Sequence, residues 1–253
     1  MSELKDMKET DVNYVHLAYE RSLRNKSVVI SNAIVRAAQG LTLAEKRIAF
    51  CAIAKIEKAL DPIKITAQEY SKTFGLPLNQ SYEQLKGASE NFWNRYLSLE
   101  IQNDGKKEHY KIRWISSFAY QNGDGYVIIN FAPEVLPYIF DLKENFTKYK
   151  LQQSWALRSM HSWRLLELIE QMNTNKDNSG WLRISVDKFH HAMESPPSYR
   201  RSFAVLRTKV IEPAIKELSE KDGWDIKWTF TKKGRKVDML DFSFKKRDRI
   251  NID

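Results

Sequence analysis

The residues in this sequence that could do chemistry are mainly cations, and they gather in its second half. Residues 149–253 carry 21 basic and 14 acidic side chains, whereas residues 1–148 carry 20 and 18, so most of the net charge of +9 is C-terminal. Between residues 200 and 236 the cations are interleaved with aromatic residues, which is typical of a folded basic surface rather than of a charged tail. Such a surface attracts anionic partners, so nucleic acid is favoured over an ordinary solvated face.

The segment 199–211 predicts an exposed helix with one apolar side. At about 100° per residue, Phe203, Leu206 and Val210 fall on one side and would pack inward. Arginine can hold guanine through two hydrogen bonds and threonine can bond a base edge, so the opposite side suits a helix that reads the DNA major groove. Pro213 predicts a kink or a new helix just beyond, and merely solvated arginines are the alternative reading. The candidate contacts from this segment are Arg200, Arg201, Arg207, Thr208 and Lys209.

A second cationic cluster surrounds Gly234, between two strands rich in aromatic residues. Cations on a tight hairpin repel one another, and an anionic partner would relieve that repulsion. A hairpin of this kind could lie along phosphates or enter a minor groove, whereas a lysine-rich tip that serves solubility is the plainer interpretation. The candidate contacts here are Lys232, Lys233, Arg235 and Lys236.

The motifs of nucleotide-driven and metal-dependent enzymes are absent. No Gly-x-x-x-x-Gly-Lys-Ser/Thr pattern could cradle the phosphates of ATP. His190 and His191 are adjacent, whereas the nicking endonucleases of rolling-circle replication bind metal through two histidines separated by one apolar residue. We expect one packed and one exposed ring, with no catalytic residue, metal or cofactor, and keep a nicking endonuclease as a rival hypothesis. Cys51, the lone cysteine, lies in an apolar run and predicts a buried thiol.

The elements that position these residues occur twice. Helix, short strand, helix, turn, helix and hairpin follow one another in both halves, and matched positions such as Arg47 with Arg164 lie 117 to 121 residues apart. After the third helix, residues 110–114 in the first half and 224–230 in the second alternate apolar and polar, which predicts the hairpin strands. N-terminal capping signals stand at Thr42 with Glu45, at Thr66 with Glu69, and at Ser185.

Three helices followed by a hairpin form the winged-helix plan, in which the third helix is presented to DNA. The sequence therefore predicts an α+β protein with two tandem winged-helix domains related by a pseudo-repeat. We expect a loose segment over residues 1–26, a first domain over 27–145 and a second over 146–253. The third helix of the first half, at about 79–93, is far less basic and predicts either a light DNA contact or self-association. Its candidate residues are Asn79, Gln80 and Lys86.

Four stretches together are specific for one family: LTLAEKRIAF (41–50), NFTKYKL (145–151), RTKVIEPAIKEL (207–218), and TKKGRK with LDFSF (231–244). On these the sequence resembles the replication initiator proteins of iteron-controlled bacterial plasmids, from about residue 28 onward. The resemblance implies a monomer that binds repeated origin sites (iterons), helps to melt the adjacent duplex and recruits the host initiator and the replicative helicase. It also implies a homodimer that pairs through the N-terminal domain and represses its own promoter at an inverted repeat.

The resemblance and the helical wheel place the DNA-reading helix in different registers. In the family, the major-groove helix falls on Arg207, Thr208 and Lys209, and the wing falls on residues 232–236. The wheel instead centres on Arg201 and Thr208. Both registers stay open at this point.

Location and partners follow from what the sequence lacks. No stretch reaches the roughly 18 consecutive apolar residues of a membrane span, and residues 1–11 lack the apolar core of a signal peptide. We therefore expect a cytoplasmic bacterial protein with double-stranded DNA as its main partner and no membrane contact. A winged-helix transcriptional repressor without a role in replication is the alternative.

Overall fold

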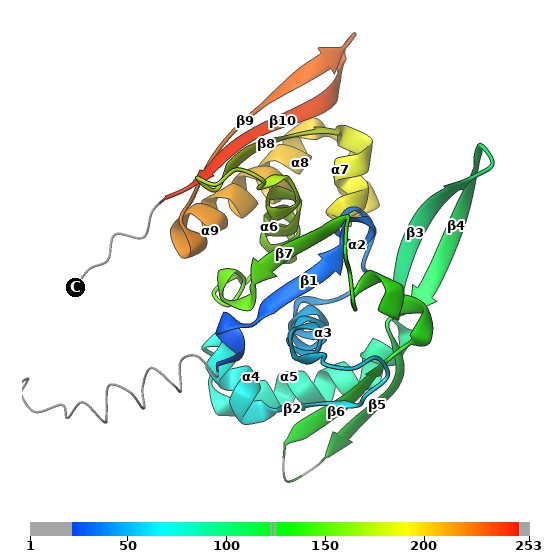
Figure 1. Cartoon of the computed structure of the whole chain (residues 1–253). Coiled ribbons are helices and arrows are strands. Elements are labelled where there is room, and N and C mark those ends of the chain that lie inside the picture. Colours follow the sequence, from blue (N-terminus) through cyan, green and yellow to red (C-terminus); the bar gives the residue numbers. More distant parts are fainter. Residues whose placement is uncertain (1–21, 122, 124, 248–253) are drawn as a thin grey trace, which may run out of the picture.

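The chain folds into two winged-helix units, which Figure 1 shows in the computed structural model. The structure describes residues 22–121, 123 and 125–247. The first unit has helices α3 (Leu43–Lys55), α4 (Ala67–Phe74) and α5 (Leu78–Asn91) and strands β2 (Ile63–Thr66), β5 (Ile115–Gln121) and β6 (Tyr126–Phe131). The second has α6 (Met160–Met172), α7 (Val186–Ala192), α8 (Phe203–Leu206), α9 (Glu212–Asp222), β8 (Ser179–Ser185), β9 (Trp224–Lys233) and β10 (Lys236–Lys246). In this described part, no helix combines the length and apolarity that crossing a bilayer requires.

Both units build the same three-stranded antiparallel sheet. In the first unit β6 lies between β2 and β5, and in the second β10 lies between β8 and β9. In each, the strand before the second helix pairs with the returning strand of the hairpin. The predicted fold class, two tandem winged-helix domains related by a pseudo-repeat, is confirmed.

The hairpin that directly follows the third helix of the first unit is not the equivalent of the C-terminal wing. Strands β3 (Tyr96–Asn103) and β4 (Lys106–Arg113) form a separate two-stranded sheet. The wing of the first unit is the next hairpin, β5 and β6, because that hairpin pairs with β2. The expected correspondence of residues 110–114 with 224–230 is therefore wrong: two successive hairpins share the same alternation, and only pairing with β2 identifies the wing.

The predicted helix starts are confirmed at all three positions. The Thr42 hydroxyl accepts from the Glu45 backbone N–H at 3.3 Å while the Glu45 carboxylate accepts from the Thr42 N–H at 2.8 Å. Thr66 and Glu69 repeat this capping box at 3.1 and 3.0 Å. Ser185 caps α7 in the same way without the reciprocal carboxylate. These local signals fix where each helix begins, independently of the tertiary packing.

Another two-stranded sheet joins the beginning of the first unit to the segment that leads into the second. Strand β1 (Ser27–Ser31) pairs antiparallel with β7 (Phe146–Lys150), and the short helix α2 (Asn32–Arg36) follows β1. The boundary expected after residue 145 lies just before β7, so this pairing crosses it.

Part of the segment expected to be loose is folded. Of residues 1–26, the first 21 lie outside the described residues. Residues 23–25 form a 3₁₀ helix in which Leu23 is buried, and the Arg24 guanidinium lies 4.1 Å from the centre of the Trp155 ring. The expectation of a loose segment therefore fails for this part, because the apolar side chain and the cation–π contact tie it down.

The two units share a core that contains a buried polar cluster. The Phe50 and Trp163 rings meet edge to face across the units, 5.5 Å between centroids. Beside them, Lys46 Nζ lies 2.7 Å from one Glu167 oxygen and Arg164 lies 2.6 Å from the other, all at most 1% exposed. One carboxylate thus faces two buried cations, and burial lowers the pKa of Lys46 to about 7 although Glu167 opposes the shift. Cys51, which lies in α3 together with Lys46, is also buried, as predicted.

The matched arginines of the repeat each bind main-chain carbonyls outside their own unit. Arg47 of α3 donates to the carbonyl of Leu157, ahead of α6, at 2.9 Å. Arg164 of α6 donates to the carbonyls of Val35 and Ala37, at the end of α2, at 2.9 and 2.6 Å. The repeated position thus holds the units together from both sides.

A carboxylate of the second unit accepts hydrogen bonds from the loop between α2 and α3. Glu194 accepts from the backbone N–H groups of Gln39 and Gly40 at 2.9 and 2.8 Å. Gly40 has φ +67, and a Cβ there would lie 2.7 Å from the carbonyl oxygen of Tyr96, so only glycine fits. The loop is therefore fixed between the two units.

Candidate nucleic-acid interface

Six of the predicted DNA-binding residues line one groove of the second unit. The groove has a volume of about 920 Å³ and lies between the tip of the β9–β10 hairpin, the start of α7 and a 3₁₀ turn (Pro197–Arg201). Its carboxylates are Asp187 and Asp238. Six cations against two carboxylates leave the groove positive, as a surface that holds phosphates requires. The six cations are Arg200, Arg201, Lys232, Lys233, Arg235 and Lys236.

The cations at the tip of the wing face solvent, and Lys232 also lies over an aromatic ring, with its Nζ 5.9 Å from the centre of Phe230. The hairpin turns at Gly234, which has φ +64, and the register sets Lys236 opposite Lys233. All four tip cations are exposed, and among the described residues none of them makes an ion pair or a side-chain hydrogen bond. The repulsion between these cations is therefore reduced by solvent or by an anionic ligand.

An aromatic cluster under the wing fixes its direction. The Phe203 ring, at the start of α8, lies 5.0 Å from the Phe230 ring and 6.2 Å from the Trp228 ring. Trp228 also stacks on Phe242 of β10, at 6.3 Å between centroids. The wing and the start of the third helix are therefore packed on each other, so the spacing between their cations is set by the core.

The third helix of the second unit is interrupted by a π-helical turn (Arg207–Ile211) between α8 and α9. Pro213 has no N–H to give to the Lys209 carbonyl, and its ring crowds that oxygen. The turn widens instead, and the Glu212 N–H donates to the Arg207 carbonyl, five residues back. The disturbance expected at Pro213 is thus present as a widened turn just before it.

The helix presents its predicted polar residues to solvent. Leu206 and Val210 are fully buried, whereas Arg207, Thr208 and Lys209 are exposed. The Arg207 guanidinium pairs with Glu212 at 2.7 Å. The Thr208 hydroxyl donates to the carbonyl four residues back at 2.9 Å, and this keeps it close to the helix axis.

Arg200 and Arg201 are not on this helix, contrary to the helical-wheel expectation. They end the preceding 3₁₀ turn, and Ser202 adopts an extended conformation, with ψ 122, before α8 begins at Phe203. A continuous wheel cannot join Arg201 to Thr208 across this break. The Arg207–Lys209 register is the one whose three side chains all lie on the helix.

The adjacent histidines face different clefts. His190 is 4% exposed and lines the basic groove, and its Nδ1 has no hydrogen-bond partner. Burial lowers its pKa, the nearby Arg200 adds to this, and Asp187 opposes it. His191 lines a second cleft, between the units. In the part of the chain described, no three His, Cys, Asp or Glu side chains are grouped to hold a metal ion.

The candidates of the first unit lie apart from the basic groove. Asn79, Gln80 and Lys86 are exposed on α5, which Figure 1 places at the opposite end of the molecule from the β9–β10 wing. Gln84, on another side of the same helix, accepts from the Tyr70 hydroxyl at 2.6 Å and so holds α5 to α4.

Three titratable groove residues were not predicted as part of the site from the sequence: Asp187, His190 and Asp238. Asp187 carried a signal, since an acidic residue in the first turn of a helix is stabilised by the helix dipole, but that signal indicates a helix start rather than a groove. His190 and Asp238 carried none, because their place in the groove depends on the packing of α7 against the wing.

The repeated sheet order and the two helical triplets define a tandem winged-helix protein. The family model described as the N-terminal winged-helix domain of initiator replication proteins matches residues 27–170, and that of the C-terminal winged-helix domain matches residues 185–244. These matches cover more than half of the chain, and the chain belongs to this family of replication initiators.

Relatives and solved structures agree with the family. The chain is 24% identical over 220 residues to a "Replication initiation protein" of Escherichia coli, covering 84% of this chain and 67% of that protein. It is 27% identical over 239 residues to the "PI protein" of Escherichia coli, covering 81% and 77%. The crystal structure of Pi initiator protein in complex with iteron DNA superposes with a TM-score of 0.76 at 23% identity, over 89% of this chain and 99% of that one. At this identity the superposition shows the shared fold.

Proposed function

We propose that this protein initiates plasmid replication by binding iterons, with the second winged-helix unit as its main DNA-binding surface. The observation that carries the proposal is the groove in which six cations from the wing and from the Pro197–Arg201 turn converge beside the exposed third helix. Membership of a replication initiator family supports the same function.

The geometry suggests a division of labour between the wing and the helix. The wing cations neutralise phosphates along the duplex backbone and supply affinity for any sequence. Arg207 reads a guanine from the helix after releasing Glu212. Because an exposed ion pair is worth about 0–1 kcal/mol, a bidentate contact with guanine worth about 1–3 kcal/mol outweighs it.

The later steps belong to the same proposal and are supported by the family resemblance. A monomer bound to iterons would help to melt the adjacent duplex and recruit the host initiator and the replicative helicase in the bacterial cytoplasm. A homodimer formed through the first unit would repress the promoter at an inverted repeat. The exposed side chains of α5, Asn79, Gln80 and Lys86, would serve a light DNA contact or self-association. The protein itself would perform no catalysis.

The DNA that flanks the gene provides the test. We expect direct repeats of about 20 base pairs, roughly two helical turns, and tighter binding to one repeat than to a scrambled duplex in fluorescence anisotropy. A DNA fragment that contains the gene and these repeats should sustain a plasmid. Equal affinity for repeat and scrambled duplexes would contradict iteron binding. Specific binding without plasmid maintenance would indicate a repressor, and a nicked product from supercoiled plasmid with Mg²⁺ would indicate an endonuclease.

A further inference from the structure

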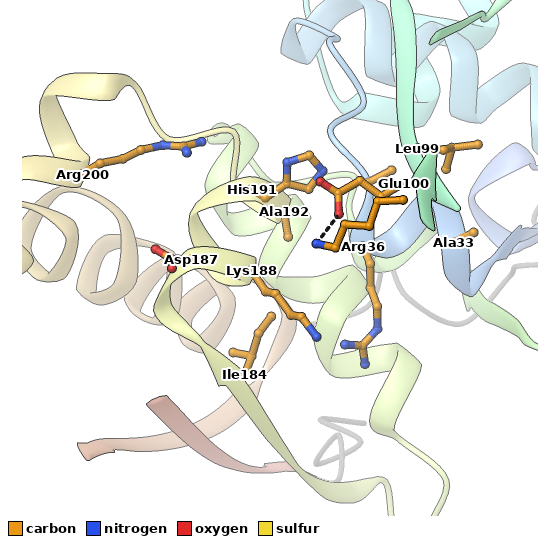
Figure 2. Close-up of a pocket in the computed structure, with 12 residues that line it drawn as sticks. Ala33, Arg36, Leu99, Glu100, Ile184, Asp187, Lys188, His191, Ala192 and Arg200 are labelled. Atoms are coloured by element: carbon orange, nitrogen blue, oxygen red, sulfur yellow. Dashed lines mark hydrogen bonds and ion pairs between the residues drawn. The ribbon is translucent and has the colours of Figure 1, made fainter. Parts of the chain in front are cut away.

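A second basic cleft lies between the two units. It has a volume of about 550 Å³, and its walls are α2 and the β3–β4 hairpin on one side and α7 with the Pro197–Arg201 turn on the other. Figure 2 shows Arg36, Lys188, His191 and Arg200 around this opening. The cleft is therefore built from residues of both units.

Most of the positive charge in this cleft is uncompensated. Four lysines and arginines line it against the carboxylates of Glu100 and Asp187. Glu100 already has Lys107 at 3.4 Å and His109 at 3.8 Å. Within the residues that the structure describes, Arg36, Lys188 and Arg200 make no ion pair and no side-chain hydrogen bond. Three free cations therefore face the same space, an arrangement suited to an anionic group.

Arg164, which is 1% exposed, connects the two walls of the cleft through hydrogen bonds. Besides the carbonyls at the end of α2, it donates to the Ala192 carbonyl, at the end of α7, at 2.7 Å. Ala37 and Ala192 themselves line the cleft. One buried guanidinium, neutralised by Glu167, thus sets the distance between the wall that carries Arg36 and the wall that carries Lys188. A site with fixed walls binds its ligand without first ordering itself.

The cleft adjoins the groove at the wing. The start of α7 borders both spaces, and Arg200 and Asp187 line both of them, so the two spaces meet at these residues. A nucleic-acid strand whose phosphates lie against the wing would run past Arg200 toward Arg36 and Lys188. The next phosphates of that strand are then the anions that come nearest to the cleft.

We propose that the cleft between the units is a second phosphate-binding site, which takes phosphodiester groups of the duplex that the wing holds. The inference rests on the proposed function and adds to it a contact made by both units, with Arg36 from the first and Lys188 from the second. The shared chemistry is a phosphate oxygen, which a DNA backbone or a free nucleotide could supply, and the structure favours the backbone because the cleft shares Arg200 and Asp187 with the wing groove.

The test removes the two cations that line the cleft and not the groove. In the Arg36→Gln/Lys188→Gln variant, two lost phosphate contacts should weaken binding to a repeat-containing duplex about 30-fold at 0.15 M salt and reduce the slope of log K against log salt by about 1.8. Lys58→Gln/Lys176→Gln is the matched control, since both lysines are exposed and line neither space. Circular dichroism and the melting temperature confirm that all variants fold.

Two further arms separate the possible failures. A Lys232→Gln/Lys233→Gln variant tests the wing alone. If it loses affinity while the cleft variant binds like the control, the cleft proposal is wrong and the proposed function stands; if neither variant loses affinity, both are wrong. Calorimetry with inorganic phosphate and with ATP identifies the source of the phosphate. Micromolar ATP binding that is abolished in the cleft variant, with DNA affinity unchanged, would assign the cleft to a free nucleotide and overturn the proposal.

Discussion

The two winged-helix units share a frame, which consists of their matching sheets and the buried core between the units. They differ in the exposed residues that this frame carries. Both have the same sheet order. Both also have an arginine at the same position of the first helix, Arg47 and Arg164, which donates to a main-chain carbonyl of the other unit. Their third helices and wings diverge. In the second unit the wing tip carries four cations and the third helix presents Arg207 and Lys209. In the first, α5 presents Asn79, Gln80 and a single lysine of the candidate set, Lys86.

This difference shows how two copies of one fold can keep the same buried residues and acquire different binding surfaces. Residues that hold the frame are buried and matched between the units, whereas exposed residues are free to change because they contribute little to folding. The first unit adds a hairpin, β3–β4, between its third helix and its wing, and this hairpin and α2 form one wall of the cleft between the units. Changes to the frame should therefore affect stability, and changes to the surfaces should affect DNA binding in one unit more than in the other.

The largest expected effect comes from breaking the shared frame. Glu167→Gln leaves Lys46 and Arg164 buried without their carboxylate, and should lower the free energy of unfolding by about 3–5 kcal/mol. Urea denaturation measures it. Glu220→Gln is the control, because its pair with Lys216 is long and exposed, at 3.9 Å. Equal stability of the two variants would show that the buried cluster does not hold the units together.

The wing of the second unit should give the next largest effect. Lys232→Gln/Lys233→Gln/Arg235→Gln removes three phosphate contacts and should weaken binding about 100-fold at 0.15 M salt, nearly equally on repeat and scrambled duplexes. Anisotropy titrations at several salt concentrations give both the affinity and the slope. A loss confined to the repeat duplex would mean that the wing reads bases.

The third helix of the second unit should act more selectively. Arg207→Ala should reduce affinity for the repeat by about 1–3 kcal/mol and hardly change affinity for a scrambled duplex, because a bidentate guanine contact exists only on the correct sequence. Competition between the two duplexes measures the ratio. Lys209→Ala is the comparison: Lys209 is exposed, and because we expect it to contact a phosphate, its loss should affect both duplexes alike.

The buried lysine of the frame predicts a pH dependence of stability. Burial lowers the pKa of Lys46 to about 7 in the folded protein, against about 10.4 when unfolded. Between these values the unfolded chain binds more protons, so the Lys46 contribution makes stability rise with pH by up to about 1.4 kcal/mol per pH unit, and it is flat below pH 7. Lys46→Met should lack this rise. Parallel stability curves for the two proteins from pH 7 to about 10 would contradict the shifted pKa.

The smallest effect is expected in the first unit. Asn79→Ala/Gln80→Ala/Lys86→Ala changes one cation and two amides at the matched helix, so affinity for the repeat should fall by about fivefold or less. Analytical ultracentrifugation of the same variant reports whether these residues serve self-association. A loss as large as that of the wing variant would remove the contrast between the units.

Local features of the fold were predictable from the sequence, and features that need two distant segments were not. Thr42 with Glu45 predicts a helix start from the sequence alone, because the capping box involves only four consecutive residues. The wing cations stand close together around one glycine, so their clustering is visible in the sequence. The identity of the first wing was not, since it depends on which hairpin pairs with β2.

The rest of the candidate site depends on tertiary packing. Arg36 and Lys188 are isolated cations in the sequence, and they line the same cleft because Arg164 joins the ends of α2 and α7. The third helix begins at Phe203 rather than at residue 199, and Phe203 packs on Phe230 of the wing, a contact between distant residues that the sequence does not reveal. The widened turn before Pro213 also shifts the helical wheel, and an ideal period of 3.6 residues misses it.

Photo-cross-linking tests the central contrast most directly. A photoreactive amino acid is placed at position 233 in the second wing or at position 86 on α5, and each protein is irradiated with the same repeat-containing duplex at 0.15 M salt. If the second unit is the main DNA-binding surface, position 233 gives abundant protein–DNA product and position 86 gives little. Abundant product from position 86 with little from position 233 would mean that the main contact lies on the first unit.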